Sequence, residues 1–354
     1  MPGIEVIGTG RIDARDSAFP QAVQLPNGDL LCSFCVGGGP NAQGGTDWAR
    51  STDGGETWSL EGTILPLVEE PYTTNFLKLT LAPDGQTVYA YGSRSNRPPG
   101  GKFGEGRNEP VLCRSTDGGH TWSPPQVVPM PCDCALEISH GALALTSGRL
   151  LAPAATLPAQ DRLGERVLTA ISDDGGHTWP AHAVVFHDET GRCGYFEQKL
   201  TELQPGRVMA VCWTVTLGDV VDQPNHFTLS NDDGATWGPA RSTGIRGQTM
   251  TPIYLGGDRL LVLYNRRYGE QGIVMALVTF TEDSWTVHSE GLMYDAGASR
   301  TRPEHLESGV EEFDDFAFGF PTAIRLHDGH LLATHWCREG GVFGINWTKL
   351  RVDW

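Results

Sequence analysis

The sequence of 354 residues has no apolar run long enough to span a membrane and no excess of positive charge. It has 26 Lys and Arg against 43 Asp and Glu, so its formal net charge is −17. This balance argues against a nucleic-acid surface and against attraction to anionic lipids. We therefore expect no nucleic-acid or membrane partner, although a few local arginines can still bind an anionic ligand.

The sequence also lacks any long stretch with the 3.6-residue apolar period of a helix. Residues 1–13 do not place an apolar core after basic residues, as a signal peptide does, so we expect a cytoplasmic protein, or a secreted one if a leader was removed. Turn-forming residues are abundant, with 45 Gly and 23 Pro. This composition favours many short strands joined by turns.

Eight cysteines are distributed along the chain, and several lie in apolar runs, such as Cys32 and Cys212. We expect these to be buried free thiols, because unpaired Cys packs as a small hydrophobic side chain. Cys132 and Cys134 lie close to His140 in the sequence, but a C-x-C pair with no second Cys or His pair departs from zinc-site spacing. We expect no metal and no cofactor.

One eight-residue segment recurs four times, and each copy follows a β-hairpin pattern of two alternating apolar runs around a glycine turn. The copies are Ser51–Trp58, Ser115–Trp122, Ser172–Trp179 and Ser230–Trp237, with a shorter relative at Thr281–Trp285. The hairpins cover Phe19–Phe34, Phe76–Tyr91, Gly141–Ala154, Glu197–Trp213, Thr251–Tyr264 and Gly319–Trp336. Six hairpins, each followed by a second strand pair, predict six four-stranded sheets arranged radially.

The predicted fold is therefore all-β, a single six-bladed β-propeller domain over residues 1–354. We place the blades at roughly 11–66, 72–128, 136–188, 194–243, 247–294 and 314–354, with residues 4–10 closing the last one. Within each repeat, Ser and Asp side chains can bind backbone N–H groups of a tight turn. We therefore expect the repeat aspartates to be turn formers rather than catalytic groups: Asp53, Asp117, Asp174 and Asp232.

The repeated pattern Ser-x-Asp-x-Gly-x-Thr-Trp resembles the Asp-box, or BNR repeat, of the sialidase (neuraminidase) superfamily. The resemblance extends from about Phe19 to the C-terminus and implies a six-bladed propeller with a pocket at one end of its axis. It also implies that the boxes lie at the periphery, and that Glu197 corresponds to a Glu that the family pairs with a Tyr nucleophile. The chain departs from the family at two arginine positions, where it has Ala18-Phe19-Pro20 and Trp213. This departure favours a relative acting on another glycan over a true sialidase.

Residues at the heads of the inner strands of a propeller converge on one mouth, so polar residues there are the candidate catalytic groups. Glycoside cleavage normally needs two carboxyl groups that flank the bond. Glu137 and Glu197 head adjacent blades and are the first pair, with Asp315 as a third candidate. Tyr195 shares a strand face with Glu197 if the strand is regular, as a nucleophile or as a packing residue. His140 follows Glu137 closely and is either an acid–base group or a structural histidine.

Further polar residues at strand heads, at strand ends and in rim loops are candidates for substrate binding. Arg266, with Arg267 and Arg338, follows a second strand and could bind an acidic sugar or be only a solvated charge. The candidate binding residues are Arg15, Asp16, Asn75, Lys78, Arg94, Asp133, Arg266, His335 and Arg338.

The function that these residues favour is a glycoside hydrolase that acts on a terminal sugar, an acidic or modified sugar included, so the expected partner is a carbohydrate substrate. Two alternatives stay open. A polysaccharide lyase would use groups such as His140 and Tyr195, and its product would absorb in the ultraviolet. A non-catalytic propeller would bind a glycan or a protein without cleaving it. The fold alone does not choose among them.

Overall fold

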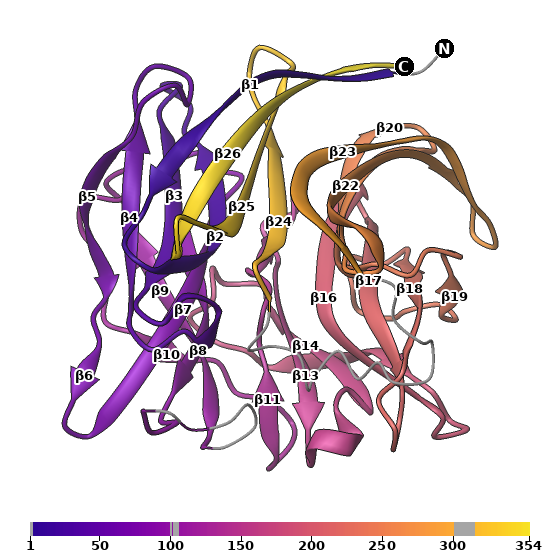
Figure 1. Ribbon diagram of the computed structural model, residues 1–354. Helices are drawn as coiled ribbons and strands as arrows, with labels where there is room; N and C mark the ends of the chain where they lie inside the picture. Colours follow the sequence, from indigo (N-terminus) through magenta and orange to yellow (C-terminus); the bar gives the residue numbers. More distant parts are fainter. Residues whose placement is uncertain (1–2, 100, 102–105, 301–315) are drawn as a thin grey trace.

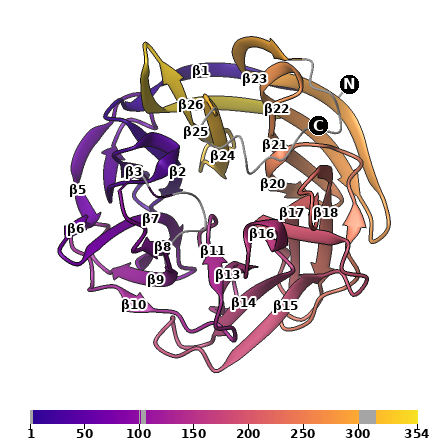
Figure 2. The same ribbon diagram turned by 60° about the horizontal axis from the view of Figure 1, so that its bottom comes forward.

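The structure is a computed structural model that describes residues 3–99, 101, 106–300 and 316–354. Six small sheets stand in a ring around a central axis (Figures 1 and 2), which confirms the predicted six-bladed β-propeller. Within the described residues, helical structure is confined to the short 3-10 turns η1 (Gly39–Asn41) and η2 (Gln160–Arg162), and neither could span a membrane.

The first three sheets follow one another along the chain, and in the second the short strand β6 precedes the inner strand β7. The first contains β2 (Ser17–Gln24), β3 (Leu30–Val36), β4 (Gly45–Ser51) and β5 (Ser59–Leu65). The second contains β6 (Val68–Glu69), β7 (Tyr72–Leu81), β8 (Val88–Ser95), β9 (Asn108–Ser115) and β10 (Gln126–Val127). The third contains β11 (Ala135–Glu137), β12 (Leu143–Ala144), β13 (Leu150–Leu157), β14 (Arg166–Ser172) and β15 (Ala181–His187).

The remaining three sheets complete the ring, and the last one joins the two ends of the chain. The fourth contains β16 (Cys193–Gln204), β17 (Arg207–Thr216), β18 (Asp222–Ser230) and β19 (Arg241–Ser242). The fifth contains β20 (Gln248–Gly256), β21 (Arg259–Arg266), β22 (Gly269–Phe280) and β23 (Trp285–Arg300). The sixth contains β24 (Phe318–Arg325), β25 (Leu331–Glu339), β26 (Val342–Asp353) and β1 (Gly3–Asp13), which pairs antiparallel with β26.

Each eight-residue box folds into a turn that its own side chains hold. In the second copy, Asp117 Oδ1 accepts hydrogen bonds from Ser115 Oγ at 2.8 Å and from the Thr121 amide at 2.9 Å. Asp117 Oδ2 accepts from Thr121 Oγ1 at 2.6 Å. The other three copies repeat these contacts. The aspartates thus form the turns, as the sequence predicts.

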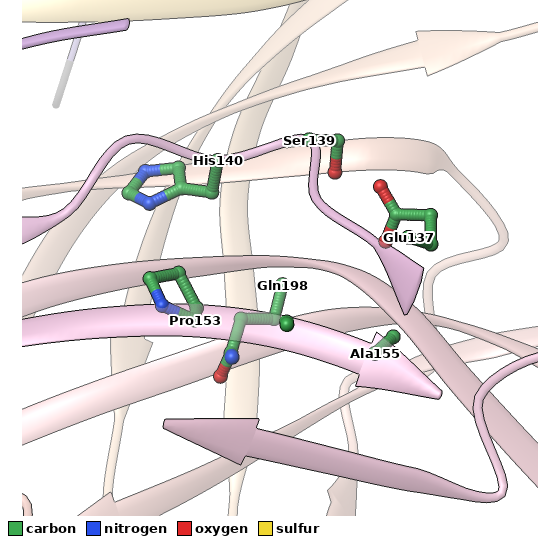
Figure 3. Close-up of a pocket in the computed structure, with 7 residues that line it drawn as sticks. Glu137, Ser139, His140, Pro153, Ala155 and Gln198 are labelled. Atoms are coloured by element: carbon green, nitrogen blue, oxygen red, sulfur yellow. The ribbon is translucent and has the colours of Figure 1, made fainter. Parts of the chain in front are cut away.

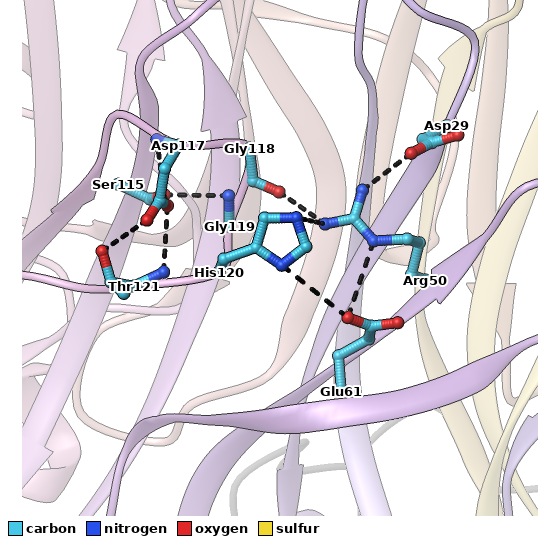
Figure 4. Close-up of polar contacts among 9 residues, drawn as sticks. All are labelled: Asp29, Arg50, Glu61, Ser115, Asp117, Gly118, Gly119, His120 and Thr121. Carbon is cyan, nitrogen blue, oxygen red and sulfur yellow. Dashed lines mark hydrogen bonds and ion pairs between the residues drawn. The ribbon is translucent and has the colours of Figure 1, made fainter.

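The boxes also join neighbouring blades (Figure 4). Arg50, on β4 of the first blade, donates to the Gly118 carbonyl of the next blade's box at 2.7 Å and to Asp29 at 2.8 Å. Arg114 repeats this contact one blade further on, since it donates to the carbonyls of Gly175 and Gly176. These charged donors satisfy turn carbonyls that would otherwise lie against a neighbouring sheet without a partner.

Candidate active site

The inner strands of four blades carry a β-bulge at the same level. In each, two residues lie opposite one residue of the next strand, and the first of the two has a positive φ. These first residues are Phe19 (φ 58°), Glu197 (φ 50°), Thr249 (φ 53°) and Phe320 (φ 51°). A left-handed conformation is unfavourable for residues other than Gly, and bulges of this kind re-aim side chains at functional sites. The bulges therefore mark this level of the axis as the candidate site.

Glu137 and Glu197, the predicted carboxyl pair, meet at this level. Glu137 ends β11, and its Oε2 accepts a hydrogen bond from the backbone N–H of Glu197 at 3.0 Å. Glu197 Oε2 in turn accepts a hydrogen bond from the Thr249 hydroxyl of the next blade. Both glutamates are buried, with 8% of each exposed. Burial and then the Glu137 carboxylate raise the pKa of Glu197 to about 7.

A small recess opens beside Glu137 (Figure 3). It is lined by Ser139 and His140 from the segment after β11, by Pro153 and Ala155 of β13, and by Gln198 of β16, as well as Ala154 and Glu137. The volume of this cavity is about 10 Å³, which is room for about one water molecule. Burial lowers the pKa of His140 well below its usual value, so its ring is neutral at physiological pH. The recess thus places a neutral imidazole and a carboxylate beside space for a water.

Two lysines and three phenylalanines lie next to the carboxyl pair. Phe19 stacks on Phe76 with ring centroids 5.0 Å apart, and its edge meets Phe320 at 5.5 Å. Lys78 Nζ lies 3.9 Å from the Phe76 centroid, and Lys199 Nζ lies 3.4 Å from that of Phe320. Both ammonium groups influence the protonation of Glu197, so cations and carboxyl groups share this site.

A third buried acid, Asp222, lies at the head of the fourth blade and contacts the fifth. Asp222, at the start of β18, accepts hydrogen bonds from Trp213 Nε1 at 2.7 Å and from Gln248 Nε2 at 3.0 Å. Gln248 Oε1 accepts from Arg267, whose guanidinium lies 3.5 Å from the ring centroid of Phe316. Burial raises the pKa of Asp222 to about 6. Because Arg267 also lowers the pKa of Glu197, this network and the glutamate pair form one electrostatic unit.

Tyr195 does not share a face with Glu197, and that expectation was wrong. The bulge at Glu197 shifts the register between Phe196 and Lys199, so the alternation of a regular strand is lost. The Tyr195 ring stacks on Phe186 at 5.2 Å and lies 5.7 Å from His226, within the core between the third and fourth blades.

Of the candidate binding residues, His335 is buried in a sheet rather than presented at the mouth. It lies opposite the Phe320 bulge, with its ring centroid 5.0 Å from that of Tyr294, and burial lowers its pKa to about 3. Asn75 is buried in a structural role, since it accepts from Thr46 at 2.7 Å and donates to the Pro66 carbonyl at 3.1 Å. Lys78, by contrast, lies beside the carboxyl pair.

The remaining binding candidates make local polar contacts. Asp16 accepts from the Gly38 amide and so holds a rim turn. Asp133 is almost fully exposed, 3.6 Å from Arg107. The four arginines face local partners: Arg15 pairs with Asp13 and Asp47, Arg94 with Glu109, and Arg266 with Glu290, while Arg338 lies over the ring of Phe343. Asp315 lies outside the described residues.

Asp222 was not among the predicted catalytic groups, because these groups come only from the heads of inner strands. Third strands run in the same direction as inner strands and begin at the same face, which is the signal that would have found Asp222. The predicted binding residues also included Arg266 but not Arg267. Arg266 closes β21 and pairs with Glu290 on β23, whereas the next residue turns toward Gln248 and the Phe318 carbonyl. Within the described residues, no cluster of three His, Cys, Asp or Glu side chains is arranged to hold a metal ion.

Comparisons with known proteins agree with this architecture. The model of the BNR/Asp-box repeat family matches residues 49–60, which include the whole first box. No curated protein sequence matches the chain. A protein of unknown function from Dyadobacter fermentans has the same fold, with a TM-score of 0.75 and 23% identity over 100% of both chains.

Two solved glycoside hydrolases also share the fold. An α-L-arabinanase from Penicillium chrysogenum, solved with arabinobiose, has a TM-score of 0.64 and 16% identity over 98% of each chain. The NanB sialidase from Streptococcus pneumoniae has a TM-score of 0.62 and 12% identity over 98% of this chain and 70% of its own. The predicted resemblance to the sialidase superfamily is therefore confirmed in repeat and in fold.

Proposed function

We propose that this protein is a glycoside hydrolase that removes a terminal sugar, with Glu137 and Glu197 as its catalytic carboxyl groups. The observation that carries this proposal is the hydrogen bond from the backbone N–H of Glu197, at its axial bulge, to the Glu137 carboxylate, which places the two glutamates next to each other. Two carboxyl groups beside one bond are the usual requirement for glycoside cleavage. The pKa of Glu197, raised to about 7 by burial, leaves this group partly protonated near neutral pH, as a general acid must be.

In this mechanism Glu197 donates a proton to the glycosidic oxygen, and Glu137 acts as the base or the nucleophile. The amide hydrogen bond to Glu137 Oε2 at 3.0 Å fixes that carboxylate in place. Thr249 orients the Glu197 carboxyl from the neighbouring blade. The recess beside Glu137 has room for the water that hydrolysis consumes. Arg267 is a positive charge close enough to lower the pKa of Glu197. Because a positive charge favours an anionic ligand, we include acidic sugars in the proposed substrate range.

The test is hydrolysis of chromogenic glycosides of neutral pentoses, neutral hexoses and acidic sugars. We expect Glu197→Gln and Glu137→Gln each to lower kcat/KM by about 10²–10⁴-fold, the usual contribution of acid–base catalysis. Glu202→Gln is the matched control. Glu202 lies on the same strand as Glu197, but near the other end, where it accepts a hydrogen bond from the Thr146 amide. Thermal unfolding of all variants separates lost catalysis from lost folding.

Two outcomes would contradict the proposal. One is wild-type protein that binds glycans but hydrolyses none of the panel, which favours a binding propeller. The other is full activity in Glu197→Gln. A product that absorbs in the ultraviolet would indicate a lyase instead, although Tyr195, a group considered for that reaction, packs in the core.

A further inference from the structure

The chain has only four lysines, and two of them are buried close together near the axis of the propeller. The four are Lys78, Lys102, Lys199 and Lys349. Lys78 and Lys199 are completely buried, each with 0% of its surface exposed. They come from the inner strands β7 and β16, and both ammonium groups approach the Phe320 ring, with Nζ at 5.0 Å and 3.4 Å from its centroid. Lys102 lies outside the described residues.

Neither buried ammonium group has a hydrogen-bond partner among the described residues. The ring faces of Phe76 and Phe320 cover one side of each group, but an ammonium has three N–H donors, which an aromatic face alone does not satisfy. A buried charged group normally pairs with an opposite charge or a ligand, because leaving water without compensation is costly. The two lysines therefore require an acceptor that the described part of the protein does not supply.

The neighbouring glutamates do not fill this role. No ion pair within 4.0 Å joins either lysine to Glu137 or Glu197 in the described residues, and both carboxyl groups are already held by other donors. Burial lowers the pKa of Lys78 well below its usual value and that of Lys199 to about 7, so the surroundings supply too little negative charge. His140, a neutral imidazole whose buried Nδ1 also lacks a partner, lies within the field of both lysines.

We propose that Lys78 and Lys199 bind a small monovalent anion of the size of chloride on the propeller axis, beside the carboxyl pair. Water would supply hydrogen-bond acceptors but no negative charge, so it would not favour the charged form of the two lysines, whose pKa values burial lowers. An anion satisfies the N–H donors and compensates the charge, while the phenylalanine rings close the other side. The proposed anion is not the sugar substrate, so occupancy of its site can be tested without any glycan.

The direct test is a crystal of the wild-type protein grown in sodium bromide and measured for bromide anomalous scattering. We expect an anomalous peak within hydrogen-bond distance of both Lys78 Nζ and Lys199 Nζ. A density at that position without anomalous signal, which indicates water only, would overturn the proposal. This test does not depend on a variant that folds.

A solution test uses thermal unfolding in sodium chloride against sodium gluconate at equal ionic strength. An anion that binds only the folded state raises its stability, so the wild-type Tm should be higher in chloride by a few degrees, roughly 2 °C or more. The double variant Lys78→Met and Lys199→Met should lose this shift, because Met fills similar space without charge. Lys349→Met should keep it, since Lys349 pairs with Glu56 at the surface. An equal shift in all three proteins would contradict the site.

Discussion

Carboxyl groups lie among packed sheets both at the periphery and on the axis of this propeller, but their hydrogen-bond partners come from different parts of the chain. At the periphery, each box aspartate receives its hydrogen bonds from the same eight-residue segment, such as Ser115 and Thr121 around Asp117. On the axis, Glu197 is held by Glu137 and Thr249, each more than 50 residues away in sequence (60 and 52). The boxes repeat around the ring, whereas the axial residues differ from blade to blade.

The two regions also shift the pKa values of their carboxyl groups in opposite directions. The hydrogen bonds from Thr121 and Thr57 lower the pKa values of Asp117 and Asp53 to about 2, so these carboxylates remain charged acceptors that keep their turns closed. Burial instead raises the pKa of Glu197 to about 7, where proton exchange is available near neutral pH. Perturbation in this direction is what a catalytic acid requires.

The contact between blades gives the largest expected change in stability. Arg50→Met removes the donors to Asp29 and to the Gly118 carbonyl, and leaves both acceptors without their charged partner. We expect the free energy of unfolding to fall by about 1.5–3 kcal/mol, the usual range for hydrogen bonds to charged groups. Urea unfolding measures it, with Arg325→Met on the exposed end of β24 as control. Activity should not change. A loss of kcat without a loss of stability would contradict the view that this peripheral contact has only a structural role.

A single box should matter less than a contact between blades. Asp232→Ala removes the acceptor of hydrogen bonds from Ser230 at 2.8 Å and from Thr236 at 2.8 Å and 2.6 Å. Because this turn lies near the surface, where water replaces part of these contacts, we expect a loss of about 1–2 kcal/mol in unfolding free energy. Asn231→Ala, at an exposed position of the same box, is the matched control. Equal Tm values for the two variants would show that the box hydrogen bonds do not hold the turn.

A third expected effect is on the pH dependence of stability, where the two regions have opposite signs. Asp53 and Asp117 have pKa values lowered from 3.8 to about 2, so their contribution is present above pH 3.8 and is lost as the pH falls toward 2. Glu197 has a pKa raised from 4.5 to about 7, so its protonated form favours folding at low pH, and this is lost as the pH rises from 4.5 through 7.

The measurement that isolates the axial contribution is the Tm of wild type and Glu197→Gln between pH 4.5 and pH 7. Wild type should lose more stability than the variant as the pH rises across this window, since Gln does not titrate. Asp222, whose pKa burial raises to about 6, contributes in the same direction in both proteins and does not explain a difference. Parallel curves would mean that Glu197 titrates in the folded protein much as it does in the unfolded chain.

The propeller itself was predictable from the sequence because its signals are local. A box contains the donors that hold its own aspartate, and a hairpin shows its alternation and its glycine within one short segment. Six such units leave few other architectures open. The carboxyl pair was predictable for a related reason, since Glu137 and Glu197 lie at the heads of consecutive inner strands, where a ring must bring them together.

Only the tertiary structure decided which side chains reach the axis and in what state. The bulges at Phe19, Glu197, Thr249 and Phe320 break strand alternation, so Glu197 does not share a face with Tyr195, which packs in the core. The meeting of Lys78 and Lys199 likewise depends on closure of the ring. Alternation and turns arise from contacts within a few residues, whereas burial, proton affinity and convergence on the axis arise from strands that are distant in the sequence.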